Sequence, residues 1–220
     1  MVFSPLQLIL TPDAFFEEKL KEPENLNKPL PIFIVLGVLG AISAYLVTQV
    51  TMQALPREVQ DFAGIATGMA VVGGIFGVFI MWLVVAVVLY ALSALFKGSG
   101  TFKRTLEFIG YGFFPQLIGS IIGLYLMYDF SSTVKVQQVS STDPQLISDA
   151  ISSLMNHPSF ILASIVGILF LLWSANLWIF GLKHARTITM RNAVFAVLAP
   201  VAIYIIYSSY NLLKLLGGGI

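Results

Sequence analysis

The side chains best suited to chemistry in this chain lie in residues 97–119, KGSGTFKRTLEFIGYGFFPQLIG. Cations gather in the Gly/Ser/Thr part of this stretch, and Glu107 follows Lys103 at the i,i+4 spacing that places both on one helix face. The spacing predicts an interfacial ion pair, or alternatively a contact with a partner or a lipid head group. The candidate contact residues are Lys97, Lys103, Arg104, Glu107 and Tyr111.

Prolines and amides within the apolar segments indicate a second kind of site. Pro115 lacks the N–H that would bond the Tyr111 carbonyl, so we expect a kink there, and Pro200 repeats this feature in the last apolar segment. Broken helices in corresponding positions are typical of transport sites, whereas membrane amides usually bond a neighbouring helix. The candidates for a helix break or cavity are Pro115, Gln116, Asn176 and Pro200.

Residues typical of enzymes and metal sites are scarce. The chain has no cysteine, and its two histidines, His157 and His184, are predicted to lie on opposite sides of a membrane. Neither a P-loop nor a zinc-protease or nucleophile-elbow motif occurs, and no apolar segment carries a pair of carboxylates. We therefore expect no catalytic site, no metal site and no cofactor. The scattered cations also predict no nucleic-acid partner.

The elements that must position these residues are membrane spans. Hydrophobic residues make up 57% of the 220 residues and charged residues 10%, against about 25% charged in soluble domains. Crossing a bilayer takes about 20 apolar residues as a helix, and the apolar runs are continuous rather than alternating, which excludes a barrel. The sequence predicts an all-α membrane bundle of five transmembrane helices, at about residues 30–54, 68–95, 106–128, 160–182 and 193–213.

The second apolar run is longer than one crossing needs. Residues 62–96 contain no charge, and as a helix they would extend about 52 Å. Even a tilted helix of that length exceeds the hydrocarbon core. We therefore expect the first third of this run to lie outside the core or along its interface.

The basic residues predict the orientation of the bundle. Of the 12 Lys and Arg residues, only Arg57, Lys135 and Lys214 fall on one side if the spans alternate, and the rest fall on the other. Because cytoplasmic loops are enriched in Lys and Arg, we place the N-terminus in the cytoplasm and the C-terminus outside.

Two segments outside the spans have helical patterns. In the cytoplasmic arm, residues 1–29, a Thr-Pro-Asp start at Thr11 predicts an amphipathic helix, either on the membrane interface or docked against the bundle. The external loop, residues 129–158, contains Asp143-Pro144, which predicts a capped amphipathic helix on the outer surface. Residues 30–216 form the five-span domain in this interpretation.

Three passages resemble the Yip-domain proteins, the Ypt/Rab-interacting family of five-span membrane proteins with a cytoplasmic N-terminus. The first resembles the start of short prokaryotic-type members, the second the family's Gly-Tyr-x-x-x-Pro third span, and the third its fourth span with the loop that follows. The passages are TPDAFF at residues 11–16, GSGTF through GYGFFP at residues 98–115, and LW through GLKH at residues 172–184. The long N-terminal region and the Asp-Leu-x-Gly-Pro sequence of eukaryotic members do not occur.

The resemblance implies a role in membrane organisation or trafficking rather than an enzyme activity. We expect an integral membrane protein, in the cell membrane of a prokaryote, that scaffolds other membrane proteins or associates with itself and contacts membrane lipids. A small GTPase is a further partner that the family implies. The alternative is a small channel or transporter with its site near the Pro115 and Pro200 breaks.

Overall fold

The structure is a computed structural model that describes residues 4–216, and all of their regular secondary structure is α-helix. Four helices are long and apolar enough to cross a membrane. This composition confirms the predicted all-α, multi-pass membrane fold. The four helices are α3 (Leu30–Ala54), α5 (Ala63–Ala94), α9 (Pro158–Arg186) and α10 (Met190–Leu216).

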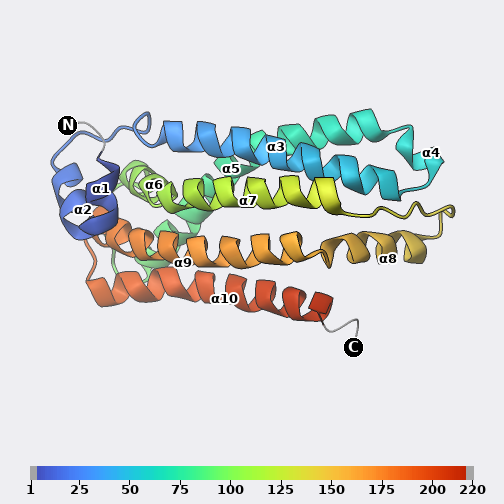
Figure 1. The fold of residues 1–220 in the computed structure, drawn as a ribbon. Helices are drawn as coiled ribbons and strands as arrows, with labels where there is room; N and C mark the ends of the chain where they lie inside the picture. Colours follow the sequence, from blue (N-terminus) through green and yellow to red (C-terminus); the bar gives the residue numbers. More distant parts are fainter. Residues whose placement is uncertain (1–3, 217–220) are drawn as a thin grey trace.

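The fifth crossing is a pair of shorter helices. α6 (Phe102–Tyr111) and α7 (Phe114–Thr133) together are long and apolar enough for one span, and they meet at a bend of 43°. The five crossings lie side by side, so the described chain begins at one end of the bundle and finishes at the other (Figure 1).

The basic segments of the chain gather at one end of the bundle. Around this end lie the helices α1 (Pro5–Leu10) and α2 (Pro12–Leu20), and α4 (Arg57–Gln60) and α8 (Pro144–Met155) lie at the opposite end (Figure 1). We call the first the basic end, and define it by residues 11–29, 97–104 and 183–191. Its predicted cytoplasmic location remains a prediction.

The helix α5 begins at Ala63 and continues for 32 residues. We expected the second span to start near Gly68, but the preceding residues are uncharged and contain no proline, so nothing in them interrupts the helix. The helix bounds do not determine where the bilayer lies, so our expectation that these first turns lie outside the hydrocarbon core stays a prediction.

Glycines bring α3 and α5 into backbone contact. A Cβ atom added to Gly40 would lie 2.8 Å from the Gly74 carbonyl oxygen, and one added to Gly74 would lie 2.7 Å from the Gly40 carbonyl carbon. Such close crossings are the usual way in which membrane helices gain packing energy. Nearer the basic end, Phe33 of α3 stacks on Trp82 of α5 with ring centroids 4.2 Å apart, inside the main apolar core.

The N-terminal arm docks on the bundle, which was the second of our two expectations for it. Phe15 and Phe16 of α2 are 2% and 0% exposed, and they pack with Phe108 and Tyr111 of α6. Two aromatic rings buried at such depth need a protein surface, because a helix lying on a bilayer leaves its apolar face to lipid. The arm therefore covers the basic end of the helix bundle.

Local capping follows the sequence closely at two helices. The Thr101 hydroxyl accepts a hydrogen bond from the Arg104 N–H at 3.0 Å and starts α6. The Asp143 carboxylate accepts one from the Gln145 N–H at 2.8 Å and starts α8, whose buried Leu154 packs against the end of α3. α8 is thus fixed to the bundle at its C-terminal turn.

Candidate functional site

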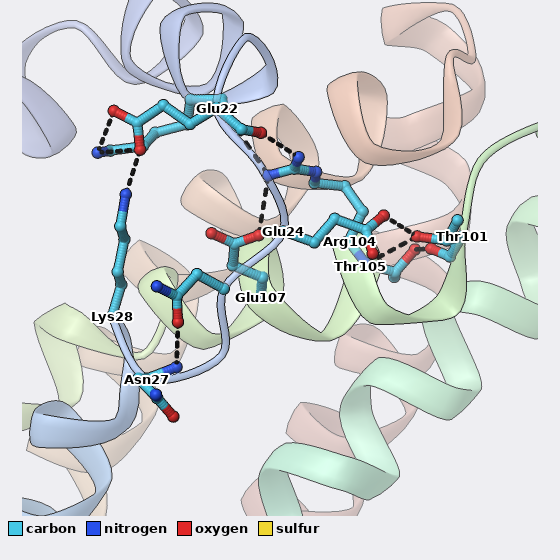
Figure 2. A network of polar contacts seen from close by, with 10 residues as sticks. Glu22, Glu24, Asn27, Lys28, Thr101, Arg104, Thr105 and Glu107 are labelled. Carbon is cyan, nitrogen blue, oxygen red and sulfur yellow. Dashed lines mark hydrogen bonds and ion pairs between the residues drawn. The ribbon is translucent and has the colours of Figure 1, made fainter. Parts of the chain in front are cut away.

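The most buried charged residue of the described chain, Glu107, lies on α6 and is paired with the buried Arg104. Arg104 Nη1 donates to Glu107 Oε2 at 2.8 Å, and Glu107 is only 1% exposed. The remaining guanidinium donors bond the arm, with Nη2 2.5 Å from the Glu22 carbonyl oxygen and Nη1 3.4 Å from the Lys19 carbonyl oxygen. One arginine therefore joins its own helix to the arm that crosses above it (Figure 2).

The arm has a second ion cluster directly above this pair. The Glu22 carboxylate accepts hydrogen bonds from Lys19, at 3.2 Å, and from Lys28 (Figure 2). The hydrogen bond from Lys28, aided by the one from Lys19, lowers the pKa of Glu22 to about 2. Thr101, the cap of α6, donates to the Glu24 carboxylate, so the arm and the helix start are bonded at several points.

The C-terminal turn of α9 completes the basic end. Asp13 of α2 accepts from Lys183 at 2.6 Å and contacts His184 Nε2 at 2.7 Å. The hydrogen bond from Lys183, followed by the one from His184, lowers the pKa of Asp13 below its usual value. These bonds tie the first helices of the arm to the fourth crossing.

Arg186 joins the end of α9 to α5 and to the loop that follows α5, a role that was not predicted from the sequence. Its Nε donates to the Ser93 hydroxyl at 2.9 Å, and its Nη atoms donate to the carbonyl oxygens of Gly98 and Gly100. The guanidinium also lies 4.0 Å from the centroid of the Tyr90 ring. In the sequence, the only sign of this role was the position of Arg186 at the end of the fourth apolar segment. The Gly/Ser loop that it bonds lies far away along the chain.

The predicted contact residues therefore divide into two groups. Lys97 and Lys103 are exposed and can meet a partner or a lipid head group. Arg104, Glu107 and Tyr111 are buried and contact the arm, so they are inaccessible in this conformation. The partner of Glu107 is Arg104, at i,i+3, rather than the exposed Lys103 that its i,i+4 spacing favoured.

The break in the third crossing lies between Tyr111 and Phe114. Pro115 occupies the first turn of α7, where its missing N–H costs nothing, and the chain bends just before it. The indole of Trp178 donates to the Ile109 carbonyl at 3.1 Å, supplying a donor at the end of α6. Tryptophan hydrogen bonding to backbone thus stabilises the bend within the apolar core.

The fifth crossing shows no corresponding break. We expected one at Pro200, but α10 runs unbroken from Met190 to Leu216 with this proline inside it. Proline's fixed φ is compatible with a helix and removes one backbone hydrogen bond, and membrane helices tolerate that loss. α10 is therefore not divided into two helices at this proline, as the third crossing is before Pro115.

A cavity of about 920 Å³ lies between α3, α5, α7, α9 and α10. Gln116 and Pro200 line it, as the predicted break-or-cavity residues should if they share a site. Several of its lining side chains are exposed, among them Met81 and Val84 of α5 and Tyr204 and Tyr207 of α10, so the cavity is open to the outside of the bundle.

Asn176 does not line this cavity. It is exposed on the outer face of α9, because its neighbours Ala175, Leu177 and Trp178 face the core. Its amide makes no hydrogen bond within the described residues. By contrast, Gln116 donates to Ser174 of α9 at 3.4 Å.

The outer face of α9 carries a regular stripe that ends at Asn176. The stripe follows the 3,4,3,4 spacing of a helix-pairing seam, and its four apolar members are between 41% and 58% exposed. Asn176 lies about 10 Å along the axis from Lys183 towards the bundle centre, so its amide is directed at the apolar surroundings of the span. The α9 stripe consists of Leu162, Ile165, Leu169, Leu172 and Asn176.

Within residues 4–216, no three His, Cys, Asp or Glu side chains come together as a metal site would require. The charged side chains of the basic end instead form pairs and small clusters, of which the Asp13–Lys183 pair joins two helices.

Comparison with known proteins gives a consistent result. The sequence profile described as the Yip1 domain matches residues 6–210, nearly the whole chain. An uncharacterised protein of Methanocaldococcus jannaschii is 32% identical over 123 residues, which cover 56% of this chain and 87% of that protein. No solved structure matches the sequence.

Proposed function

The chain belongs to the Yip1 domain family, and from this premise we propose that it organises membrane proteins by pairing its α9 stripe with another transmembrane helix. Family membership indicates a multi-pass membrane protein of membrane organisation or trafficking. The similar archaeal protein agrees with a place in the cell membrane of a prokaryote.

The observation that carries the proposal is the outward amide of Asn176. A polar group facing hydrocarbon without a partner is unfavourable, and asparagines in membrane helices gain stability by bonding across a helix pair. Asn176 occupies one position of a 3,4-spaced apolar stripe, where a single asparagine fixes the register of a helix pair.

A second copy of the chain is the occupant that we propose for the α9 stripe. An amide carries both a donor and an acceptor, so two Asn176 side chains related by a two-fold axis satisfy each other. The apolar residues of the stripe are self-complementary in the same arrangement. The resulting dimer would present two basic ends, each with exposed Lys97 and Lys103, on one side of the membrane.

Disulfide crosslinking in native membranes tests this proposal, because the chain has no cysteine of its own. A single cysteine at Leu169 or Leu172 should give disulfide dimers under mild oxidation. A cysteine at Phe76, which is 58% exposed on the outer face of α5, is the matched control and should give few.

The amide is tested by combining Leu169→Cys with Asn176→Leu. Interhelical hydrogen bonds in membranes contribute about 0.6–1.7 kcal/mol, so dimer formation should fall by about threefold to twentyfold, and Asn176→Gln should retain most of it. Equal crosslinking at Phe76, or no effect of Asn176→Leu, would contradict pairing through α9. Adducts with a different protein would replace the second copy by a heterologous helix.

A further inference from the structure

We propose that the cavity between the spans is a binding site for one membrane lipid, with hydrocarbon in the cavity and the polar end near Ser208 and Asn211. This inference does not depend on the α9 stripe, because the cavity faces the interior of the bundle and the stripe faces outward.

The length and closure of the cavity fit a lipid chain. At the end nearest the basic end it is closed by Phe113, Trp178 and Leu89, all of them at most 7% exposed. Along α7 it reaches from Phe113 to Met127, about 21 Å at the helical rise. One leaflet of a bilayer is about 15 Å thick in hydrocarbon, half of the 30 Å core, so a leaflet-length chain fits.

The chemistry of the walls selects hydrocarbon over water. No charged residue lines the cavity among those described, and its surface is mostly apolar. Filling 920 Å³ with water would take about 30 molecules, each needing two to four hydrogen bonds. Gln116 is the largest amide in the closed half, and its nitrogen is already bonded to Ser174.

A side opening lies between α5 and α10. Met81 and Val84 of α5 line the cavity and are 51% and 45% exposed, so they form one rim. Tyr204 and Tyr207 of α10 line it and are 54% and 67% exposed, so they form the other. A lipid can enter sideways from the bilayer through an opening of this kind without crossing polar surroundings.

The polar end of the lipid has a defined place. Ser208 and Asn211 line the cavity in the last turns of α10, at the end of the bundle opposite the basic end. Tyrosines in this region are typical of the membrane–water interface, where lipid head groups lie. An amphiphile bound this way has its polar group beside a hydroxyl and an amide and its chain among aliphatic residues.

Photochemical labelling tests the proposal on the full-length protein. The purified chain is reconstituted in phosphatidylcholine vesicles that contain a phosphatidylcholine with a diazirine in mid-chain, illuminated, and mapped by mass spectrometry. Adducts should form on Met127, which is only 8% exposed and lines the cavity, in addition to surface positions such as Phe76. Labelling confined to surface positions would overturn the proposal.

Cavity-filling variants separate an interior lipid from the surrounding bilayer. Gly123 and Gly167 line the cavity, and a Cβ on either would meet no atom within 4 Å. Gly123→Leu and Gly167→Leu should therefore lower Met127 labelling at least tenfold and leave Phe76 labelling unchanged. Gly77→Leu, at an equally open glycine that does not line this cavity, is the matched control and should change neither. Undiminished Met127 labelling in both cavity variants would overturn the proposal.

A cysteine at Ser120 tests for water independently of any cavity-filling variant. Ser120 lines the cavity and the chain is otherwise free of cysteine. A lipid-filled cavity predicts no reaction of Ser120→Cys with a water-soluble, membrane-impermeant methanethiosulfonate. Complete labelling would show a water-filled path, overturn the lipid site and favour the channel or transporter alternative.

Discussion

At the scale of single residues, the buried arginines of this apolar chain are held by several polar partners each. Arg104 bonds Glu107 and two arm carbonyls, and Arg186 bonds a hydroxyl and two loop carbonyls. A buried charge is tolerated only with such a set of partners. These arginines therefore join segments that are distant in sequence. Directional hydrogen bonds of this kind fix the relative positions of the segments more specifically than apolar contacts do.

The buried pair on α6 predicts a large effect from a small change. Glu107→Gln removes the negative charge and leaves Arg104 buried without its counterion, so the free energy of unfolding should fall by about 3 kcal/mol. The measurement is thermal or denaturant unfolding of purified protein in detergent, followed by circular dichroism. Lys103→Gln, at an exposed position one residue from the same arginine, should leave stability unchanged. Equal midpoints for Glu107→Gln and the wild type would show that the pair contributes no net stability.

Sequence was sufficient for residues whose chemistry is local. Thr101 as the cap of α6 was predictable, because a cap depends on atoms within one turn of the chain. The rule that placed a bend at Pro115 also placed one at Pro200, where α10 is unbroken. The choice of Arg104 over Lys103 as the partner of Glu107 was not predictable, because it depends on which face of α6 the arm covers. The outward direction of Asn176 likewise follows from the arrangement of whole helices.

At the scale of elements, the bend in the third crossing is held by a close approach. Gly112 has φ of −66°, which any residue can adopt, so its lack of a side chain serves packing rather than backbone conformation. A Cβ there would lie 2.6 Å from Nε1 of Trp178, the atom that donates to the end of α6. The bend and the indole therefore require each other.

Gly112→Ala should destabilise the protein by about 1–3 kcal/mol, because the added methyl group displaces the Trp178 indole from its hydrogen bond. Gly123→Ala in α7, where nothing lies within 4 Å of the new Cβ, is the matched control and should be neutral or slightly stabilising. Unfolding midpoints and Trp fluorescence measured on both variants check this. An unchanged midpoint in Gly112→Ala would mean that the indole adjusts without loss.

Hydrophobic length predicted the spans better than it predicted their irregularities. Both the broken third crossing and the unbroken α10 contain a proline preceded by apolar residues. What distinguishes them is the Gly-Tyr-Gly sequence before Pro115 and two tryptophans from other helices that donate to the α6 carbonyls of Leu106 and Ile109. The two tryptophan contacts come from other helices, so they cannot be predicted from the sequence of the third crossing by itself.

At the scale of the whole molecule, five crossings place the start of the chain at the basic end and its finish at the end that carries α4 and α8 (Figure 1). The predicted orientation gives a direct test. Single cysteines at Ser99 and Thr187, both exposed at the basic end, should react with an impermeant maleimide only from the cytoplasmic side, and Thr142→Cys only from outside. The Lys and Arg bias of the loops is the physical reason. Labelling in the reverse pattern would invert the bundle, and labelling of Ser99 and Thr187 from different sides would contradict the five crossings.

The length of α5 has a consequence for where in a cell such a protein resides. Its 32 residues extend about 48 Å, whereas the hydrocarbon core is about 30 Å thick, and its far turns are apolar and exposed at Phe62, Ile65 and Met69. This hydrophobic mismatch can be reduced by tilting α5 or by thickening the bilayer around it. Because this cost falls as the bilayer thickens, we expect the protein to favour thicker membrane regions wherever the first turns of α5 enter the hydrocarbon rather than lie at its interface. An overlong helix thereby gives the bundle a preference among membranes that requires no partner at all.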